Sequence, residues 1–247
     1  MKLRFIDEFG RYLILLKTMF ARPENFTMYR KETFRQMHDI GVGSLSIIGL
    51  IAFFIGAVTA VQFAYQLEGS FIPAYYIGYI VRDSTIIELA PTISCLVLAG
   101  KVGSNIAAEI GGMRQKEQID ALEIMGVNTA AYLVGPKIFA GCVVIPCLVI
   151  IAAGISMSGG YLAAVSSGFV TPNDYLFGLH SFFESYYVFM MIVKAVVFGF
   201  ILTSVACYKG YYVSGGSIEL GKASTQAVVL SNIMILVADY LIALMLT

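Results

Sequence analysis

Long apolar blocks separated by shorter polar segments run along most of the chain, and this pattern predicts helices that cross a membrane. A helix needs about 20 residues to cross a hydrocarbon core about 30 Å thick. Five blocks are long enough, at about 44–65, 76–106, 130–156, 186–208 and 225–246. The sequence therefore predicts an all-α membrane protein with about five transmembrane helices.

The segment before the first block has a different pattern. Between residues 3 and 20, apolar side chains from Phe5 to Phe20 recur at helical spacing and basic side chains fill other positions. Such an amphipathic helix lies in the membrane interface rather than crossing it. Arg22 and Pro23 end the helix, and a polar stretch at about 27–41 leads into the membrane. We therefore divide the chain into an interfacial or cytoplasmic region, 1–43, and a five-helix transmembrane domain, 44–247.

Composition supports a membrane protein. Hydrophobic residues make up 58% of the chain and charged residues 13%, whereas soluble domains carry roughly 25% charged residues. The formal net charge of +0 gives no reason to expect nucleic acid binding. Two isolated histidines and four cysteines without metal-ligand spacing predict neither a catalytic nor a metal site in this chain.

The distribution of Lys and Arg predicts the orientation. Residues 1–43 contain eight of them, and residues 157–187 contain none. Because short cytoplasmic segments are enriched in Lys and Arg, the N-terminus is expected in the cytoplasm. An odd number of spans then places the C-terminus on the outside.

Several charged residues fall within or at the edge of the spans, where a charge is costly and often functional. They are Arg82, Glu88, Lys101, Lys194 and Asp239. Because proline lacks an N–H group, Pro91 is expected to kink the helix that carries Glu88.

The sequence leaves the role of each of these charges open. Glu88 either contacts a lipid headgroup or a partner helix, or serves as a polar clamp between helices. Arg82 marks the outer membrane boundary in one interpretation. Lys194 and Asp239 either pair across helices or extend separately towards water.

The most polar internal segment, at about 107–128, is predicted to be a cytoplasmic loop. Residues 114–125 have the pattern of a short amphipathic helix, with Ile119, Leu122 and Met125 on one face. Such a helix is either a docking element for a soluble partner or a solvated loop helix without a partner.

One segment nearly matches a phosphate-binding loop. Residues 216–223 have its glycine and lysine spacing, but Ala223 stands where the motif needs Ser or Thr to hold Mg²⁺. The preceding segment is an apolar span rather than a strand. We therefore expect no ATP site in this chain, so ATP-driven work requires a partner.

Several motifs together resemble those of the MlaE-type permeases. The runs 109–113 and 117–126 resemble the signature loop of that family. Residues 88–91, 99–104 and 215–229 and the Asp239–Tyr240 pair resemble further family motifs, so the likeness covers nearly the whole chain. Ile87 departs from the pattern because the family has Arg there. The charge partner of Glu88 is therefore open, with Arg82 and Lys101 as candidates.

The resemblance implies a function. MlaE-type permeases are membrane subunits of ATP-driven lipid transporters of the bacterial inner membrane, and they work with MCE-domain proteins on the periplasmic side. It implies a homodimer that moves phospholipid and docks on a cytoplasmic ABC ATPase dimer, which holds ATP and Mg²⁺. Candidates for the coupling interface are Glu109, Glu117, Gln118, Asp120 and Glu123.

Two other functions are alternatives to the transporter permease. An intramembrane lipid-modifying enzyme needs convergent catalytic groups, and neither His38 nor His180 has a nucleophile motif nearby. An ion-coupled secondary transporter commonly shows an inverted repeat or paired broken helices, and neither is evident here.

Overall fold

The fold is a bundle of long helices. The computed structural model describes residues 2–20, 26–67 and 72–246, and these residues contain no strand. Within them, five helices are long and apolar enough to cross a membrane, at Thr27–Leu67, Tyr76–Gln115, Ala130–Ser166, Ser185–Tyr211 and Ser217–Leu246. The all-α membrane fold is thus confirmed, although several spans are longer than the sequence predicted.

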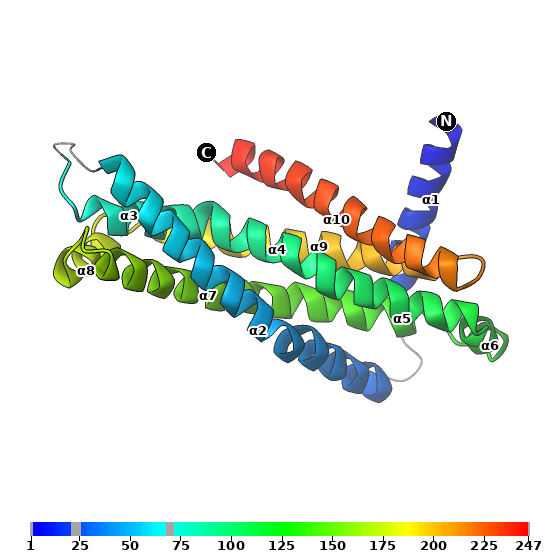
Figure 1. Cartoon of the computed structure of the whole chain (residues 1–247). Helices are drawn as coiled ribbons and strands as arrows, with labels where there is room; N and C mark the ends of the chain where they lie inside the picture. Colours follow the sequence, from blue (N-terminus) through cyan, green and yellow to red (C-terminus); the bar gives the residue numbers. More distant parts are fainter. Residues whose placement is uncertain (1, 21–25, 68–71, 247) are drawn as a thin grey trace.

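The N-terminal helix α1, Lys2–Met19, lies at a steep angle to the long helices (Figure 1). Leu15 packs into the core, whereas Phe9 and Ile14 on other faces are exposed. The hydroxyl of Tyr12 is 2.8 Å from that of Ser204, and burial raises the pKa of Tyr12. The amphipathic helix is therefore present and attached to the bundle by one face. The predicted break at Arg22 and Pro23 lies outside the described residues.

The first span is a single helix, α2, Phe26–Leu67. The polar stretch at 27–41, which was predicted to lead into the membrane, is the first part of this helix. Its buried residues explain the continuity, because they recur every three or four positions through both parts: Thr33, Gln36, Ile40, Ser44 and Ile48.

The second span combines α-helical and π-helical segments. It runs through α3 (Tyr76–Ser84), η1 (Thr85–Ile93), α4 (Ser94–Leu98), η2 (Ala99–Gly103) and α5 (Ser104–Gln115). Pro91 lies inside the π-helical segment η1, which accommodates it without ending the helix. The span extends nine residues beyond its predicted end at 106.

The remaining helices follow in order. They are α6 (Gln118–Ile124), η3 (Ala130–Val134), α7 (Gly135–Ser166), α8 (Pro172–His180), α9 (Ser185–Tyr211) and α10 (Ser217–Leu246). The third span, η3 and α7, extends ten residues beyond its predicted end at 156. α2 packs closely along α7, because a Cβ on Gly56 would lie 1.8 Å from the carbonyl oxygen of Ser156.

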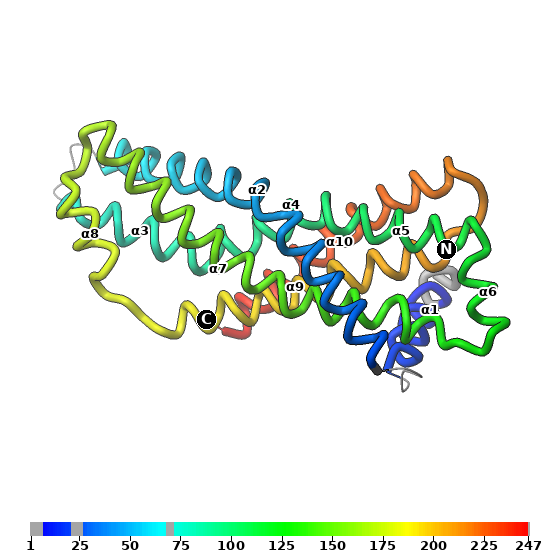
Figure 2. The backbone as a smooth tube through the Cα atoms, turned by 90° about the horizontal axis from the view of Figure 1, so that it is seen from below, coloured from blue at the N-terminus to red at the C-terminus, as the bar shows by residue number. Residues whose placement is uncertain are grey.

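The two ends of the bundle differ. α3 and α8 form one end, and α6 lies at the other, near the start of α10 and near α1 (Figure 2). α10 is the least enclosed span. Only 17% of the residues in its most apolar window are buried, compared with 56% for α9.

Candidate functional site

A cluster of charged side chains joins three spans inside the bundle. The ammonium of Lys194 on α9 lies 2.7 Å from the carboxylate of Glu88 on η1 and 2.7 Å from that of Asp239 on α10. The side chain of Lys194 is only 1% exposed. We call Glu88, Thr92, Lys194 and Asp239 the ion cluster.

The ammonium of Lys194 contacts the backbone of η1 as well as the two carboxylates. It donates to the carbonyl of Ile87 at 3.1 Å. A lysine ammonium has three protons. Ile87 and Glu88 accept hydrogen bonds from two of them, and Asp239 compensates the charge of the ammonium as an ion pair at 2.7 Å.

Thr92 links the two carboxylates. Its hydroxyl is 3.1 Å from Glu88 and 3.1 Å from Asp239, and it has one proton to donate to either. With one ammonium and two carboxylates, the ion cluster has a formal charge of −1 when all three groups are ionised. Asp239 is 11% exposed and Glu88 is 48% exposed. Glu88 is thus the member that faces out of the bundle.

The structure decides between the sequence-based alternatives for this cluster. Lys194 and Asp239 form a pair rather than extending separately towards water. Lys194 also supplies the charge partner of Glu88, so neither Arg82 nor Lys101 substitutes for the family arginine at position 87. The sequence pattern does not reveal this, since Lys194 and Glu88 are 106 residues apart.

Arg82 is a clamp at the α8 end of the bundle. It is 3% exposed and forms an ion pair with Asp83 at 2.7 Å. Its guanidinium also donates to the carbonyl oxygens of Leu179, Ser181 and Phe182, at 2.8, 2.7 and 3.2 Å. These contacts fasten the connection between α8 and α9 to α3. Arg82 is therefore a buried structural residue as well as a candidate marker of the membrane boundary.

Lys101 lies on η2, towards the α6 end of the bundle. Its ammonium donates to the carbonyl of Gly43 on α2. Glu109, predicted as part of a loop, instead lies on the membrane-spanning helix α5 and pairs with Lys137 of α7 at 2.6 Å.

The predicted loop helix at 114–125 is wrong in its extent. Arg114 and Gln115 end α5, and Glu117 adopts a left-handed conformation with φ of 58°. α6 begins only at Gln118, so two helices meet where the periodicity predicted one. A residue in the left-handed region does not continue a right-handed α-helix, so the helix is interrupted here. Periodicity alone does not register such a break.

The acidic residues near α6 differ in their surroundings. Asp120 pairs with Arg114 at 2.6 Å, and Glu123 accepts hydrogen bonds from Thr129 and Tyr211. Glu117 and Gln118 are exposed. The coupling candidates therefore include residues tied to their own chain and residues that project from it.

The apolar side chains of α6 do not share one face as predicted. Ile119 is buried, but Met125 is 68% exposed. Ile124, which is not part of the predicted face, is 88% exposed. An exposed apolar side chain at the end of a polar helix indicates a contact surface. The sequence alone does not show this exposure, because it does not show where α6 begins and ends.

The segment that resembles a phosphate-binding loop forms the connection into α10. α10 begins at Ser217, and the element before it is the helix α9. The strand that precedes such a loop in nucleotide-binding proteins is therefore replaced by a helix. Among residues 2–20, 26–67 and 72–246, no three His, Cys, Asp or Glu side chains are grouped to hold a metal ion.

Comparisons with known proteins place this geometry in context. The family described as "Permease MlaE" matches residues 33–245. A "Probable ABC transporter permease protein" of Rickettsia bellii is 39% identical over 96% of this chain and 90% of its own length. The "Intermembrane phospholipid transport system permease protein MlaE" of Haemophilus influenzae is 33% identical over 84% of this chain and 80% of its own length. A "Probable ABC transporter permease protein" of Synechocystis is 33% identical over 87% of this chain and 81% of its own length.

Proposed function

The chain belongs to the MlaE permease family, and from this premise we propose that it moves phospholipid as the membrane subunit of an ABC transporter. Its assembly contains two copies of the chain, a cytoplasmic ATPase dimer and a periplasmic MCE-domain protein. The name of the Haemophilus relative, which refers to intermembrane phospholipid transport, supports this substrate. The relatives are described as permeases, which favours transport over catalysis.

The half-exposed carboxylate of Glu88 is the observation that carries the proposal. It lies within the second span, and a charged group facing lipid there costs about 2.5–3.5 kcal/mol. That cost disappears if this face lines a hydrated cavity between two copies of the chain. Lys194 and Asp239 then hold Glu88 at the wall of a path along which a lipid headgroup moves.

α6 is the proposed contact with the ATPase. It lies at the end of the bundle (Figure 1). The apolar Ile124 and Met125 and the charged Glu117 are exposed there. A short helix with exposed apolar and charged side chains suits a groove on a soluble partner. ATP and Mg²⁺ are held by that partner, whose closure moves α6 and with it α5.

The proposed orientation follows the distribution of Lys and Arg. It puts α6 and the N-terminus in the cytoplasm of a bacterial cell, and α8 and the C-terminus in the periplasm. α8 and the α8–α9 connection then face the MCE-domain partner, and α6 faces the ATPase.

Copurification with the ATPase tests the proposal. Ile124→Asp combined with Glu117→Lys should reduce recovery of the ATPase about tenfold or more, because it places charges in the apolar part of the contact and reverses one in the polar part. Lys222→Glu, an exposed charge reversal on α10, is the matched control and should leave recovery unchanged. Transport of phospholipid at the full rate by the chain without any ATPase would contradict the proposal.

A further inference from the structure

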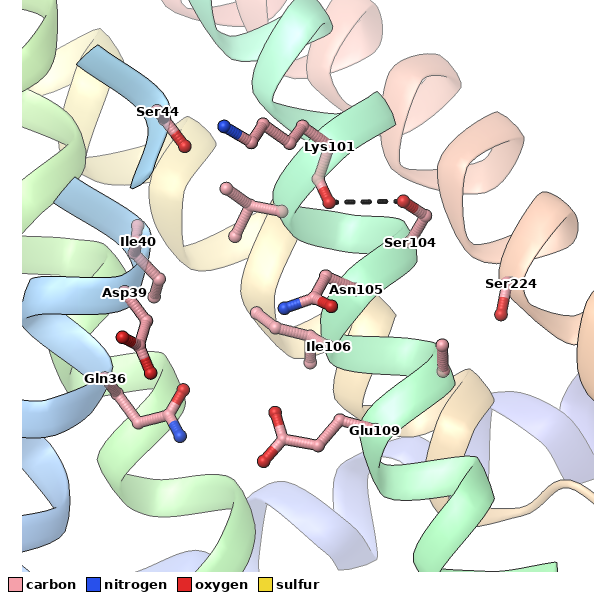
Figure 3. A pocket seen from close by; sticks show the side chains of 12 residues that line it. Gln36, Asp39, Ile40, Ser44, Lys101, Ser104, Asn105, Ile106, Glu109 and Ser224 are labelled. Carbon is pink, nitrogen blue, oxygen red and sulfur yellow. Dashed lines mark hydrogen bonds between the residues drawn. The ribbon is translucent and has the colours of Figure 1, made fainter. Parts of the chain in front are cut away.

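A cavity of about 580 Å³ lies between α2, the η2–α5 part of the second span and the start of α10, towards the α6 end of the bundle, and it is lined by both polar and apolar side chains. It is distinct from the ion cluster, because none of the four ion-cluster residues lines it. Figure 3 shows the side chains of Ser44 and Asp39 on one wall and those of Lys101, Asn105 and Glu109 on the other.

Ser44 is the first sign that the cavity is built for a ligand. Its side chain is fully buried, and its hydroxyl has no hydrogen-bond partner among the described residues. A helical serine commonly donates to a carbonyl three or four residues earlier. Ser104 in the same cavity does so, with Gly100. A buried hydroxyl without a partner is unfavourable, so a ligand atom that accepts its proton would stabilise this arrangement.

Lys101 supplies positive charge beside Ser44. Its side chain extends across the cavity towards Ser44 (Figure 3). Among the described residues its ammonium contacts the carbonyl of Gly43, which uses one of its three protons. The remaining protons and the Ser44 hydroxyl together suit an anion that has several oxygen acceptors, such as a phosphate group.

Carboxylates lie at the other end of the cavity, nearer to α6. Glu109 is paired with Lys137 at 2.6 Å, so its charge is already partly compensated. Among the described residues, the only ion-pair or hydrogen-bond contact of the Asp39 carboxylate is with the ring of His38 at 3.4 Å, and the Asp39 side chain is 54% exposed. Asp39 is thus the carboxylate best able to accept hydrogen bonds from a cation.

The order of these charges matches one class of molecule. Asp39 precedes Ser44 by five residues, which is about 7.5 Å along a helix, and it lies on the side nearer to α6. In a phospholipid the phosphate lies between the acyl chains and the terminal group of the head. A lipid of the adjacent leaflet therefore places its phosphate at the depth of Ser44 and Lys101. Its terminal group lies at the depth of Asp39.

We propose that this cavity binds the headgroup of an amine-bearing phospholipid, with the phosphate at Lys101 and Ser44 and the primary ammonium at Asp39. The site rests on the proposed function, because it specifies the lipid that the permease takes from the leaflet beside α6. A primary ammonium can donate hydrogen bonds to Asp39, whereas the ammonium of a choline group has no N–H protons to donate. A glycerol headgroup carries no positive charge.

Native mass spectrometry of the full chain in detergent tests the site by titration with phosphatidylethanolamine, phosphatidylglycerol or diacylglycerol. Lys101→Met should weaken binding of both phospholipids about tenfold, since it removes a charge-assisted hydrogen bond. Ser44→Ala, a second and smaller change, should weaken both about threefold. Asp39→Asn should remove the preference for phosphatidylethanolamine over phosphatidylglycerol. Lys222→Met and Glu219→Gln, both exposed on α10, are the matched controls and should bind as wild type does.

The other outcomes separate this site from the function on which it rests. If the wild type binds phosphatidylethanolamine and Lys101→Met and Ser44→Ala bind it equally well, the site is wrong and the permease function stands. If the wild type binds no phospholipid, both are wrong. Displacement of the lipid by millimolar inorganic phosphate, but not by chloride of equal ionic strength, would identify a free-anion site and overturn the lipid assignment. Equal binding of diacylglycerol would also overturn it.

Discussion

Lys194 organises the intramembrane polar residues at the scale of single side chains. It comes from α9 and contacts a backbone carbonyl and a carboxylate of η1 and a second carboxylate of α10. This position explains how a lysine is tolerated with 1% exposure inside an apolar span.

Replacing Lys194 with Met should destabilise the protein strongly. The substitution keeps the length of the side chain but leaves Asp239 buried beside a second carboxylate. Removing one partner of a buried ion pair costs about 3–5 kcal/mol. The free energy of unfolding in detergent measures this loss. Adding Asp239→Asn should restore part of it, and equal stability of the single and double variants would contradict the pairing.

Glu88→Gln should separate function from stability. The Glu88 side chain is about half exposed, and Lys194 keeps Asp239 as its partner, so we expect a small change in melting temperature. Phospholipid transport by the reconstituted transporter should fall about tenfold or more, because the charge at the wall of the proposed path is lost. Undiminished transport would leave Glu88 with a structural role only.

At the scale of elements, the contact between α2 and α7 depends on glycines. A Cβ on Gly159 of α7 would lie 2.3 Å from the carbonyl oxygen of Phe53 of α2, just as one on Gly56 would meet Ser156. Both glycines therefore let the two backbones approach closely. Small residues commonly serve this purpose between membrane helices.

Gly56→Ala should destabilise the bundle by about 1–3 kcal/mol, since α2 and α7 must separate to admit a methyl group. Thermal unfolding in detergent measures the change. Gly154→Ala on α7 is the matched control, because a Cβ there meets nothing within 4 Å. A Gly56→Ala protein as stable as the control would contradict the close packing.

At the scale of the whole molecule, the two ends of the bundle have different structures. The α8 end is closed by the buried Arg82 and its three backbone carbonyls. The other end presents α6 with an exposed apolar tip and opens into the cavity at Lys101. Such an asymmetry suits a protein that meets a different partner on each side of the membrane.

Cysteine labelling tests which side is which. In a background with Cys142 and Cys147 replaced by alanine, Ser167→Cys should react with an impermeant maleimide added to spheroplasts. Gln115→Cys should react only after the membrane is opened. Both positions are exposed, so accessibility differs only through the membrane. The reverse pattern would invert the orientation and remove α6 from the cytoplasm.

The sequence by itself determined the membrane class, the five spans, the amphipathic α1 and the family. These depend on local properties, namely the length of apolar blocks, helical periodicity and short motifs. Span ends were less accurate at 106 and 156, because the apolar blocks end before the helices do. The roles of the candidate site residues remain predictions.

Only the tertiary structure decided which charges meet. Lys194 pairs with Glu88 and Asp239 because three helices bring their side chains within 2.7 Å, and no local pattern encodes that approach. The break at Glu117 and the exposure of Ile124 likewise depend on how α6 is placed after α5. The physical reason is the same throughout. The sequence of a single segment is enough to predict that it crosses the membrane. An ion pair or a cavity forms between segments and depends on how they pack together.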